Sequence, residues 1–290
     1  MYKYSIIIPH HNIPNLLQRC LDSIPERKDI QIIVVDDNSS EEQVDFSCFP
    51  GSQRTNLITI FDKDGGGAGH ARNIGLKQVD AKWVLFADAD DLFSEHAFEE
   101  LDKFSDRDAD LVMFKTRSVM SDTLEPVYRG GAGINPAIDN YFEGKMSEED
   151  VSFANMAPWC KLISYDLIKS ENILFDEVMY GNDIMFSTKV ACAAKKVLIS
   201  KFELYTITLR PGSLTYNWGK SVENNLCRLK VRIRRNKFLK EQGKKQEFLP
   251  VYAIDALKNK NGAFWRIVWL LLTNNMLFAG LGNYLSNKFK

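Results

Sequence analysis

The sequence has few cysteines, and their spacing excludes several kinds of site. Five cysteines are spread over 290 residues, and no two have the short separation of a zinc or redox motif. We therefore expect buried, free thiols in a reducing compartment. The five residues are Cys20, Cys48, Cys160, Cys192 and Cys227.

The sequence also lacks a signal peptide and a long hydrophobic run. The apolar segment Tyr4–Ile8 is too short for a secretion signal and is followed by Pro9. The apolar stretch that begins at Phe264 is interrupted by Arg266 and by Asn274-Asn275, which argues against a membrane span. There is no internal repeat or low-complexity segment. We expect a cytoplasmic protein.

Charge is unevenly distributed along the chain. Residues 219–290 hold 15 Lys and Arg against 4 Asp and Glu, which leaves 22 against 34 for the residues before them. A chain of this length fits one large domain, or a main domain with an appendage. We predict an acidic main domain over residues 1–218 and a basic helical extension over residues 219–290.

Three short apolar segments predict buried parallel strands, and a polar loop follows each of them. Ligands of parallel α/β sheets bind outside the carboxyl ends of the strands. We therefore expect the three loops to meet at one edge of a sheet. The predicted strands are Tyr4–Ile8, Ile30–Val35 and Trp83–Ala87, and the loops that follow them are 9–12, 36–39 and 88–91.

The third loop contains three carboxylates within four residues, at Asp88, Asp90 and Asp91. Packing like charges this closely costs free energy unless a divalent cation, an Arg or Lys, or water offsets it. Mg²⁺ or Mn²⁺ takes one or two carboxylates and completes its shell with water and phosphate oxygens. The alternative is a solvated acidic turn in which Asp91 or Ser94 caps a following helix.

A glycine-rich loop, residues 65–69, follows a further predicted strand at Leu57–Phe61. It lacks the G-x-G-x-x-G spacing of a dinucleotide site, so binding of NAD is disfavoured. Glycines at this place would let backbone amides approach a phosphate, with Arg72 on the next helix supplying positive charge. The alternative is a flexible loop beside a solvated arginine.

The basic extension contains a predicted helix at Leu226–Lys240 and the aromatic stretch Phe264–Leu272. Basic residues beside Trp and Phe are typical of helices that lie on anionic lipid surfaces. We therefore consider peripheral membrane contact through residues 226–290. The alternative is a helical cap that packs on a core and exposes a basic face.

Seven motifs occur in the order that is typical of one enzyme family. Over residues 4–213 the sequence resembles the family 2 glycosyltransferases. The motifs are Ser5-Ile6-Ile7-Ile8-Pro9 with Asn12, Ile33-Val34-Val35-Asp36-Asp37-Asn38-Ser39, Ala71-Arg72-Asn73-x-Gly75, Phe86-x-Asp88-Ala89-Asp90-Asp91, Trp159-x-Lys161-Leu162, Phe175-Asp176 and Asp183-x-x-Phe186.

The resemblance implies an α/β GT-A fold with a mostly parallel nucleotide-binding sheet flanked by helices. It implies a nucleoside-diphosphate-sugar donor, with UDP-sugar the first choice, and transfer with inversion at the anomeric carbon. On the donor side it places Pro9 and Asp37 at the base and ribose, Arg72 near the nucleotide, and Asp88 at the ribose.

The resemblance also assigns the metal, the catalytic base and the acceptor side. Asp90, helped by Asp91, would bind Mn²⁺ or Mg²⁺, and Asp183 would be the base that faces the acceptor hydroxyl. Trp159 and Lys161 fall on the acceptor side. The alternative for Asp183 is a helix N-cap only.

Two positions depart from the family pattern. His10-His11 stands where the family commonly has a small or apolar residue and Tyr, which puts the base-stacking contact in doubt. Asn182 replaces the acidic residue that usually precedes the catalytic Asp, so the acceptor geometry is in doubt as well.

The leading interpretation is a hexosyltransferase that builds a cell-surface polysaccharide or lipopolysaccharide from a saccharide or lipid-linked acceptor, without a nucleic-acid partner. Two alternatives stay open. A sugar nucleotidyltransferase would need a glycine-rich, arginine-containing loop after the first strand, where this chain has Pro9–Asn12. A non-catalytic nucleotide-sugar-binding protein is favoured only if Asp90 and Asp183 prove dispensable.

Overall fold

The computed structural model describes residues 1–127, 134–210, 222–258 and 262–288. The chain forms two compact units, Met1–Pro211 and Gly212–Lys290, which are described separately. The domain boundary predicted between residues 218 and 219 lies outside the described residues. Most of the glycine-rich segment at 128–136 lies outside them as well.

The first unit is built on an eight-stranded, mixed sheet with the strand order β3-β2-β1-β4-β7-β6-β8-β5. The neighbours β3, β2, β1 and β4 are parallel, as are β6 and β8, while β7 and β5 pair antiparallel with their neighbours. The strands are β1 Tyr2–His10, β2 Ile30–Asp37, β3 Leu57–Asp62, β4 Ala81–Phe86, β5 Leu92–Phe93, β6 Leu111–Met120, β7 Lys161–Ser164 and β8 Val197–Leu209.

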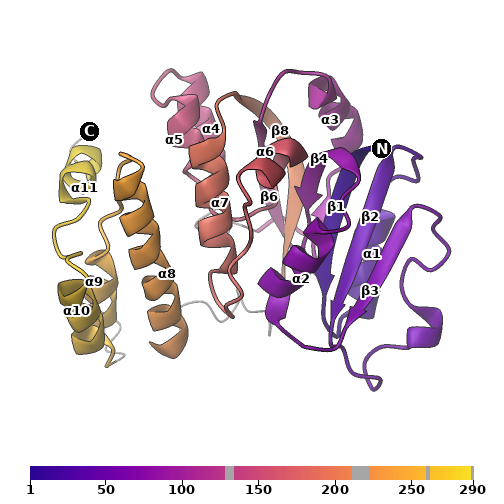
Figure 1. Cartoon of the computed structure of the whole chain (residues 1–290), viewed down its shortest axis with the longest axis horizontal. Coiled ribbons are helices and arrows are strands. Elements are labelled where there is room, and N and C mark those ends of the chain that lie inside the picture. The colour runs from indigo at the N-terminus through magenta and orange to yellow at the C-terminus, as the bar shows by residue number, and fades with distance from the viewer. Residues whose placement is uncertain (128–133, 211–221, 259–261, 289–290) are drawn as a thin grey trace. The chain divides into compact units, whose positions relative to one another are not determined.

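Helices pack on both faces of this sheet (Figure 1). Helix α7 contacts both α2 and α6. In this view α2 lies in front of the strands, whereas α1 lies behind them. The helices of the unit are α1 Pro14–Asp22, the 3-10 turn η1 Phe46–Cys48, α2 Gly67–Leu76, α3 Ala97–Ser105, α4 Ile134–Phe142, α5 Glu148–Ser152, α6 Tyr165–Ser170 and α7 Asn182–Ala193.

The central strands of the sheet are continuous apolar runs in the sequence because both of their faces are buried. From Tyr4 onward every residue of β1 is buried, as is every residue of β2, because helices cover both faces. Trp83 on β4 is fully buried and donates its indole N–H to the carbonyl of Ser105, 2.9 Å away. The predicted strands and the mostly parallel α/β architecture are confirmed.

One strand prediction was wrong. Residues 197–200 and 204–208 are short apolar segments that predict two separate strands, but the structure has a single strand, β8, over Val197–Leu209. It pairs with β6 through register shifts on either side of Lys115, so the strand continues past the residues between the two segments.

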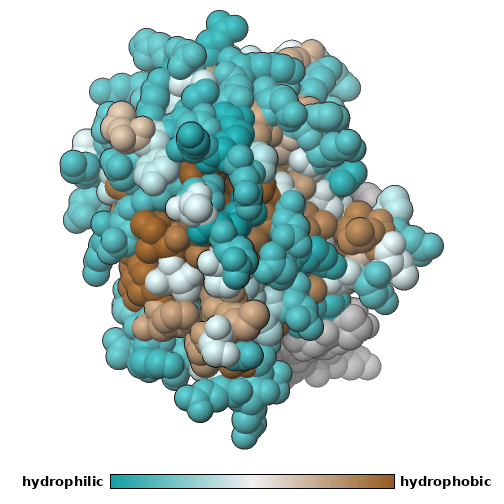
Figure 2. Space-filling view, turned by 90° about the vertical axis from the view of Figure 1, so that its right-hand side faces the viewer, coloured by the Kyte–Doolittle hydropathy of each residue, from teal (hydrophilic) through white to brown (hydrophobic). Residues whose placement is uncertain are grey.

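Strand β3 forms one edge of the sheet, and Figure 2 shows the side of the molecule on which it lies. A hydrophobic area appears there within a largely hydrophilic surface. Ile58 and Phe61 of β3 are both exposed, and Phe61 packs edge-to-face against Phe46 and Phe49. The packing of these three phenylalanine rings therefore helps to hold β3, which pairs only with β2 among the described strands.

The second unit contains four helices within its described residues and has a hydrophobic core of its own. Leu229, Ile233, Ile267 and Leu271 are among its buried residues. No helix in the described parts of the chain combines the length and hydrophobicity needed to cross a membrane. The helices are α8 Val222–Glu241, α9 Val251–Lys258, α10 Phe264–Thr273 and α11 Leu281–Lys288.

Gly75 allows α2 to approach the sheet closely, which gives a testable prediction. A Cβ at this position would lie 2.6 Å from the Cγ2 of Ile7 in β1. Overpacking costs about 1–3 kcal/mol, and the better helix propensity of Ala returns at most about 1 kcal/mol. We expect Gly75→Ala to lower the melting temperature measured by calorimetry.

The matched control is Gly282→Ala in α11, where a Cβ meets no atom within 4 Å. We expect this variant to melt at the same temperature as the unmodified chain or higher. An unchanged melting temperature in Gly75→Ala would contradict the close packing of α2 on β1.

Candidate active site

The carboxyl ends of β1, β2 and β4 meet at one edge of the sheet. β1 lies between β2 and β4, parallel to both, so the loops that follow the three strands are neighbours. The amide of Asn12 donates to the hydroxyl of Ser39 at 2.8 Å, and Arg19 donates to the carbonyl of Asp90 at 2.9 Å. The convergence predicted from the sequence is confirmed by this topology.

A buried histidine–aspartate pair fixes the loops after β1 and β2. His10 Nδ1 lies 2.7 Å from Asp36 Oδ2, and the amide of Ile13 donates to His10 Nε2 at 3.2 Å. Because Nε2 accepts, Nδ1 carries the proton and donates to Asp36. Burial opposes the charge of Asp36, but hydrogen bonds from His10 and Ser39 outweigh it and lower the pKa of its carboxyl.

Asp37 ends β2 beside the glycine-rich loop. The amide of Gly67, the first residue of α2, donates to Asp37 Oδ2 at 2.9 Å, and His11 Nδ1 lies 2.7 Å from the Asp37 carbonyl. Burial raises the pKa of the Asp37 carboxyl. Pro9 is buried one position before His10, and its strand partner is Val35.

Arg72 of α2 connects the acidic loop after β4 to the start of α7. Its guanidinium is buried and donates to Asp88 Oδ1 at 2.6 Å and to Asn182 Oδ1 at 2.9 Å. The same group lies 5.3 Å from the centre of the Phe175 ring. The alternative of a solvated arginine is therefore wrong, because a buried guanidinium is held by an anion, an amide and an aromatic ring.

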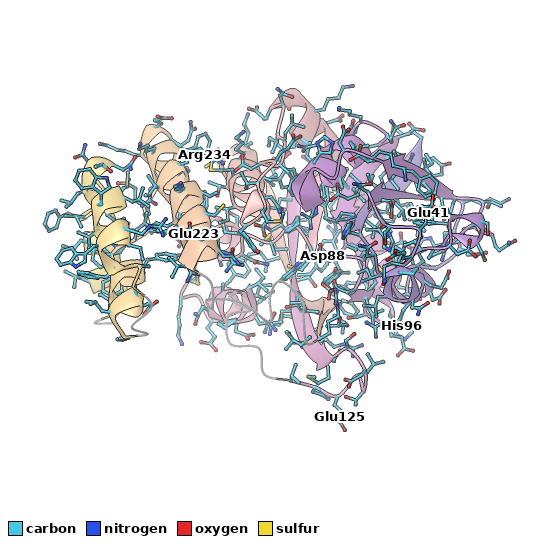
Figure 3. All side chains as sticks on the ribbon, turned by 90° about the horizontal axis from the view of Figure 1, so that it is seen from below. Glu41, Asp88, His96, Glu125, Glu223 and Arg234 are labelled. Atoms are coloured by element: carbon cyan, nitrogen blue, oxygen red, sulfur yellow. The ribbon has the colours of Figure 1, made fainter. Side chains whose placement is uncertain are left out.

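Asp88 and Asp90 are partly exposed at this edge, and each has a cationic partner. The side chain of Asp88, labelled in Figure 3, is about a third exposed and pairs with Arg72. Asp90 Oδ2 lies 3.3 Å from the Nε of Arg210, which follows β8. Burial, followed by the negative charge of Asp88, raises the pKa of the Asp90 carboxyl.

Asp91 faces the interior. It is 3% exposed and accepts a hydrogen bond from the amide of Thr208 on β8 at 2.7 Å. Burial and the charges of Asp90 and Asp88 raise its pKa well above the ordinary range. The alternative of a helix-capping turn is wrong, since α3 has His96 as N-cap residue and Asp91 bonds to a distant strand.

Asp183 lies in the first turn of α7 but does not cap the helix. The N-cap is Gly181, with φ of 78°, and no side chain makes a capping hydrogen bond, so the N-cap alternative is wrong. Burial raises the pKa of the Asp183 carboxyl against the opposing charge of Arg72, and Asp88 raises it further. Asp183 therefore lies within electrostatic range of the acidic loop.

The two residues predicted on the acceptor side differ in their surroundings. Trp159 is half-buried and stacks on Tyr205, with ring centres 5.6 Å apart and an angle of 6° between the rings. Lys161 is fully buried and donates to the carbonyl of Asn155 at 2.8 Å. Its positive charge partly opposes the rise in the pKa of Asp183 that burial causes. Trp159 is thus partly exposed, whereas Lys161 is enclosed by its neighbours.

Two groups at this edge have the chemistry of a metal site. Asp88, Asp90 and Asp91 bring three carboxylates close together, and burial followed by the charge of Asp88 raises the pKa of Asp90. A divalent cation would relieve both effects. A second group, Asp62, Asp64 and His70, brings its ligand atoms within 4.8 Å of one another. The sequence analysis did not identify this second group.

Other site residues were also missed by sequence reasoning. Arg210 and Thr208 contact the acidic loop from β8, more than a hundred residues away in the chain. The pair of His10 and Asp36 was missed as well, although both residues lie at predicted strand ends. A polar residue at the end of each neighbouring parallel strand was the signal available for that pair.

Comparison with known proteins settles the family. The profile described as Glycosyl transferase family 2 matches residues 5–170, more than half of the chain. The chain belongs to glycosyl transferase family 2. The resemblance inferred from the motifs of the sequence is therefore confirmed, and the chain is a glycosyltransferase.

Curated relatives carry glycosyltransferase names. The chain is 29% identical over 231 residues to glycosyltransferase GlyA of Streptococcus pneumoniae, covering 74% of this chain and 32% of the relative. It is 24% identical to poly(ribitol-phosphate) beta-N-acetylglucosaminyltransferase TarS of Staphylococcus aureus, covering 73% and 36%. The chain spans about a third of the length of these relatives.

Solved structures confirm the fold. The chain superposes on a crystal structure of S. aureus TarS residues 1–349 in complex with UDP-GlcNAc, with a TM-score of 0.63 and 20% identity. This match covers 81% of the chain and 66% of the TarS structure. The GT-A-like arrangement expected from the sequence is therefore shown.

Proposed function

We propose that this chain transfers a sugar, with inversion at the anomeric carbon, from a UDP-sugar to a hydroxyl of a growing cell-surface polymer. The observation that carries the proposal is that Arg72 links Asp88 of the acidic loop directly to Asn182, the residue before Asp183. Donor-side and base-side carboxylates therefore belong to one site. The names of the relatives, which include poly(ribitol-phosphate) transferases, support a saccharide or polyol-phosphate acceptor.

On the donor side, Pro9 and Asp37 hold the nucleobase and ribose, and Asp88 reaches the ribose hydroxyls. The amide of Gly67 fixes the carboxylate of Asp37, which is buried at the end of β2. Arg72 sets the position of Asp88 through their 2.6 Å ion pair and places positive charge near the nucleotide. UDP-GlcNAc bound to the TarS structure supports UDP as the nucleotide.

Asp90 is the residue proposed to hold a divalent cation, Mn²⁺ or Mg²⁺. Its carboxylate is partly exposed, while that of Asp91 points inward and keeps Thr208 of β8 in place. Asp91 is therefore proposed to help by holding the loop. When bound, the cation neutralises the negative charge that develops on the departing diphosphate.

Asp183 is the proposed general base. Its carboxylate takes the proton of the acceptor hydroxyl while the hydroxyl oxygen forms a bond to the anomeric carbon. The bond from that carbon to the diphosphate oxygen breaks, and its electron pair leaves with UDP. Attack from the face opposite the leaving group gives inversion without a covalent intermediate. The aromatic face of Trp159 forms a wall of the acceptor side.

The two alternative functions are less well supported. A nucleotidyltransferase requires a glycine-rich, arginine-containing loop after β1, whereas this loop is tied down by the buried pair of His10 and Asp36. A non-catalytic binding protein does not require an ionisable carboxylate at Asp183. The kinetic test of Asp183 below separates binding from catalysis.

The second unit is proposed to contact anionic membrane surfaces, which brings the enzyme to lipid-linked acceptors on the cytoplasmic side. Trp265 and Trp269, one turn apart on α10, are 76% and 67% exposed. They line a groove with Lys230 and Arg266. Aromatic side chains beside cations suit the lipid headgroup region, and residues 219–290 carry an excess of basic residues.

The metal assignment predicts the effect of Asp90→Asn on UDP binding. Replacing the charged ligand with a neutral amide of the same shape should weaken UDP binding in the presence of Mn²⁺ by at least about tenfold. Binding without Mn²⁺ should change little. Isothermal titration calorimetry with and without Mn²⁺ measures both. Asp122→Asn, an exposed aspartate, is the control, and equal Mn²⁺-dependent affinity in both variants would refute the assignment.

The assignment of Asp183 predicts a kinetic effect without loss of donor binding. We expect Asp183→Asn to bind UDP normally and to lose at least about 100-fold in turnover, since general base catalysis contributes 10²–10⁴-fold. Asp166→Asn, in the first turn of α6, should retain turnover. Product formation from UDP-sugar donors, measured by UDP release, is the readout.

The raised pKa of Asp183 also sets the pH dependence. The base is active only when ionised, so turnover should rise with pH through a pKa above that of an ordinary aspartate. A pH profile whose acid limb lies at the ordinary value of about 3.8 would argue against Asp183 as the base.

Membrane contact predicts a vesicle-binding defect. The double variant Trp265→Ser and Trp269→Ser should co-sediment with phosphatidylserine-containing vesicles at least several-fold less than the unmodified chain, because two interfacial anchors are lost. Leu124→Ser, at an exposed apolar residue of the first unit, is the control. Equal sedimentation of the double variant and the control would exclude α10 as the contact.

A further inference from the structure

Two carboxylates and a histidine gather at the end of β3 and the start of α2, apart from the acidic loop after β4. We infer that Asp62, Asp64 and His70 bind a divalent transition-metal ion such as Zn²⁺ or Mn²⁺. Asp62 is the last residue of β3, Asp64 follows it in the loop, and His70 lies in the first turns of α2. Each residue places a ligand atom within 4.8 Å of the other two.

The histidine has the geometry of a metal ligand. Its Nδ1 lies 3.2 Å from Glu177 Oε1, and its Nε2 faces Asp62 Oδ2 at 3.6 Å. A metal-bound histidine usually donates its other ring N–H to a carboxylate, which fixes the ring and directs the lone pair of the second nitrogen at the metal. Glu177 is itself held by Asn73, whose amide donates to it at 3.2 Å.

Asp62 supplies a second, independent observation. Its Oδ2 atom is buried and has no hydrogen-bond partner among the described residues. A buried carboxylate oxygen without a donor costs free energy, so such atoms call for an unseen partner. Two ligands about 2.1 Å from one metal ion lie roughly 3–3.4 Å apart. The 3.6 Å separation of Asp62 Oδ2 and His70 Nε2 therefore needs little adjustment.

Local charge also favours a cation. The carboxylates of Asp37 and Asp62 lie close enough for the charge of Asp62 to raise the pKa of Asp37. The positive N-terminus of α2 opposes a cation, but the amide of Gly67 is already bonded to Asp37. Among the described residues, Asp62 then has only His70 beside it as a possible cationic partner, and the side chain of Asp64 is exposed.

The ligand set selects the kind of metal. A combination of one imidazole and two carboxylates suits Mn²⁺, Co²⁺ or Zn²⁺, whereas Mg²⁺ and Ca²⁺ prefer oxygen ligands alone. A bound ion would tie the end of β3 to α2 and hold the loop between them, which includes Gly67 and supports Asp37. Its role is therefore to order the loop beside the donor side, independently of the acidic loop at Asp90.

Titration of the metal-free full chain with Co²⁺, in the absence of nucleotide, tests the site. Visible absorption and calorimetry report binding, and the chain should take up one Co²⁺ with a rise in melting temperature. His70→Ala and Asp62→Asn should each weaken this binding at least tenfold, and Glu177→Gln should weaken it about 10- to 100-fold. Circular dichroism checks that the variants are folded.

Two controls separate this site from others. His96 also lies near two carboxylates, of Glu95 and Glu99, but it is on the surface (Figure 3), so His96→Ala should bind Co²⁺ as the unmodified chain does. Asp90→Asn should also keep the nucleotide-independent ion. The inference is overturned if the chain takes up no Co²⁺, if His70→Ala binds it unchanged, or if Asp90→Asn alone removes it.

Discussion

The buried guanidinium of Arg72 is the interaction on which the rest of the site depends. A charge taken out of water is tolerated only with close partners, and here Asp88, Asn182 and the ring of Phe175 supply them. These partners come from the loop after β4, the start of α7 and the segment before it. One side chain therefore holds the loop after β4 and the start of α7 in a fixed relation.

The neighbouring carboxylates also each have a close hydrogen-bond or ionic partner. Asp90 has Arg210 beside it, Asp91 has the amide of Thr208, and Asp36 has His10 and Ser39. Each partner stabilises a charge that would otherwise repel its neighbours. The pKa of Asp36 falls because its hydrogen bonds outweigh burial, while the pKa values of Asp90 and Asp91 rise because burial and mutual repulsion prevail.

The two units differ in which side chains they bury and which they expose. The first unit buries its sheet between helices, and the polar loops after β1, β2 and β4 meet at the carboxyl ends of these strands. The second unit packs its own core and leaves large apolar side chains such as Trp265 and Trp269 in solvent. Exposed side chains of this size indicate a surface that meets something other than water.

Local patterns were sufficient to predict much of this protein from its sequence. Buried parallel strands read as apolar runs because helices cover both their faces, and polar residues at their ends marked the edge where ligands bind. The motifs then assigned the family, the fold and the positions of Asp37, Asp90 and Asp183. Those inferences use only short stretches of the sequence, because hydrophobic periodicity and the ends of strands are determined by residues close together in the chain.

What only the tertiary structure decided are the contacts between distant segments. Arg210 beside Asp90, Thr208 beside Asp91 and Glu177 beside His70 each join residues more than a hundred positions apart. The sequence contains no periodic signal for them, because they depend on how β8 and the segment before α7 return to the sheet. The burial and the charged neighbours of each carboxylate, and hence its pKa, depend on where β8 and the segment before α7 pack against the sheet.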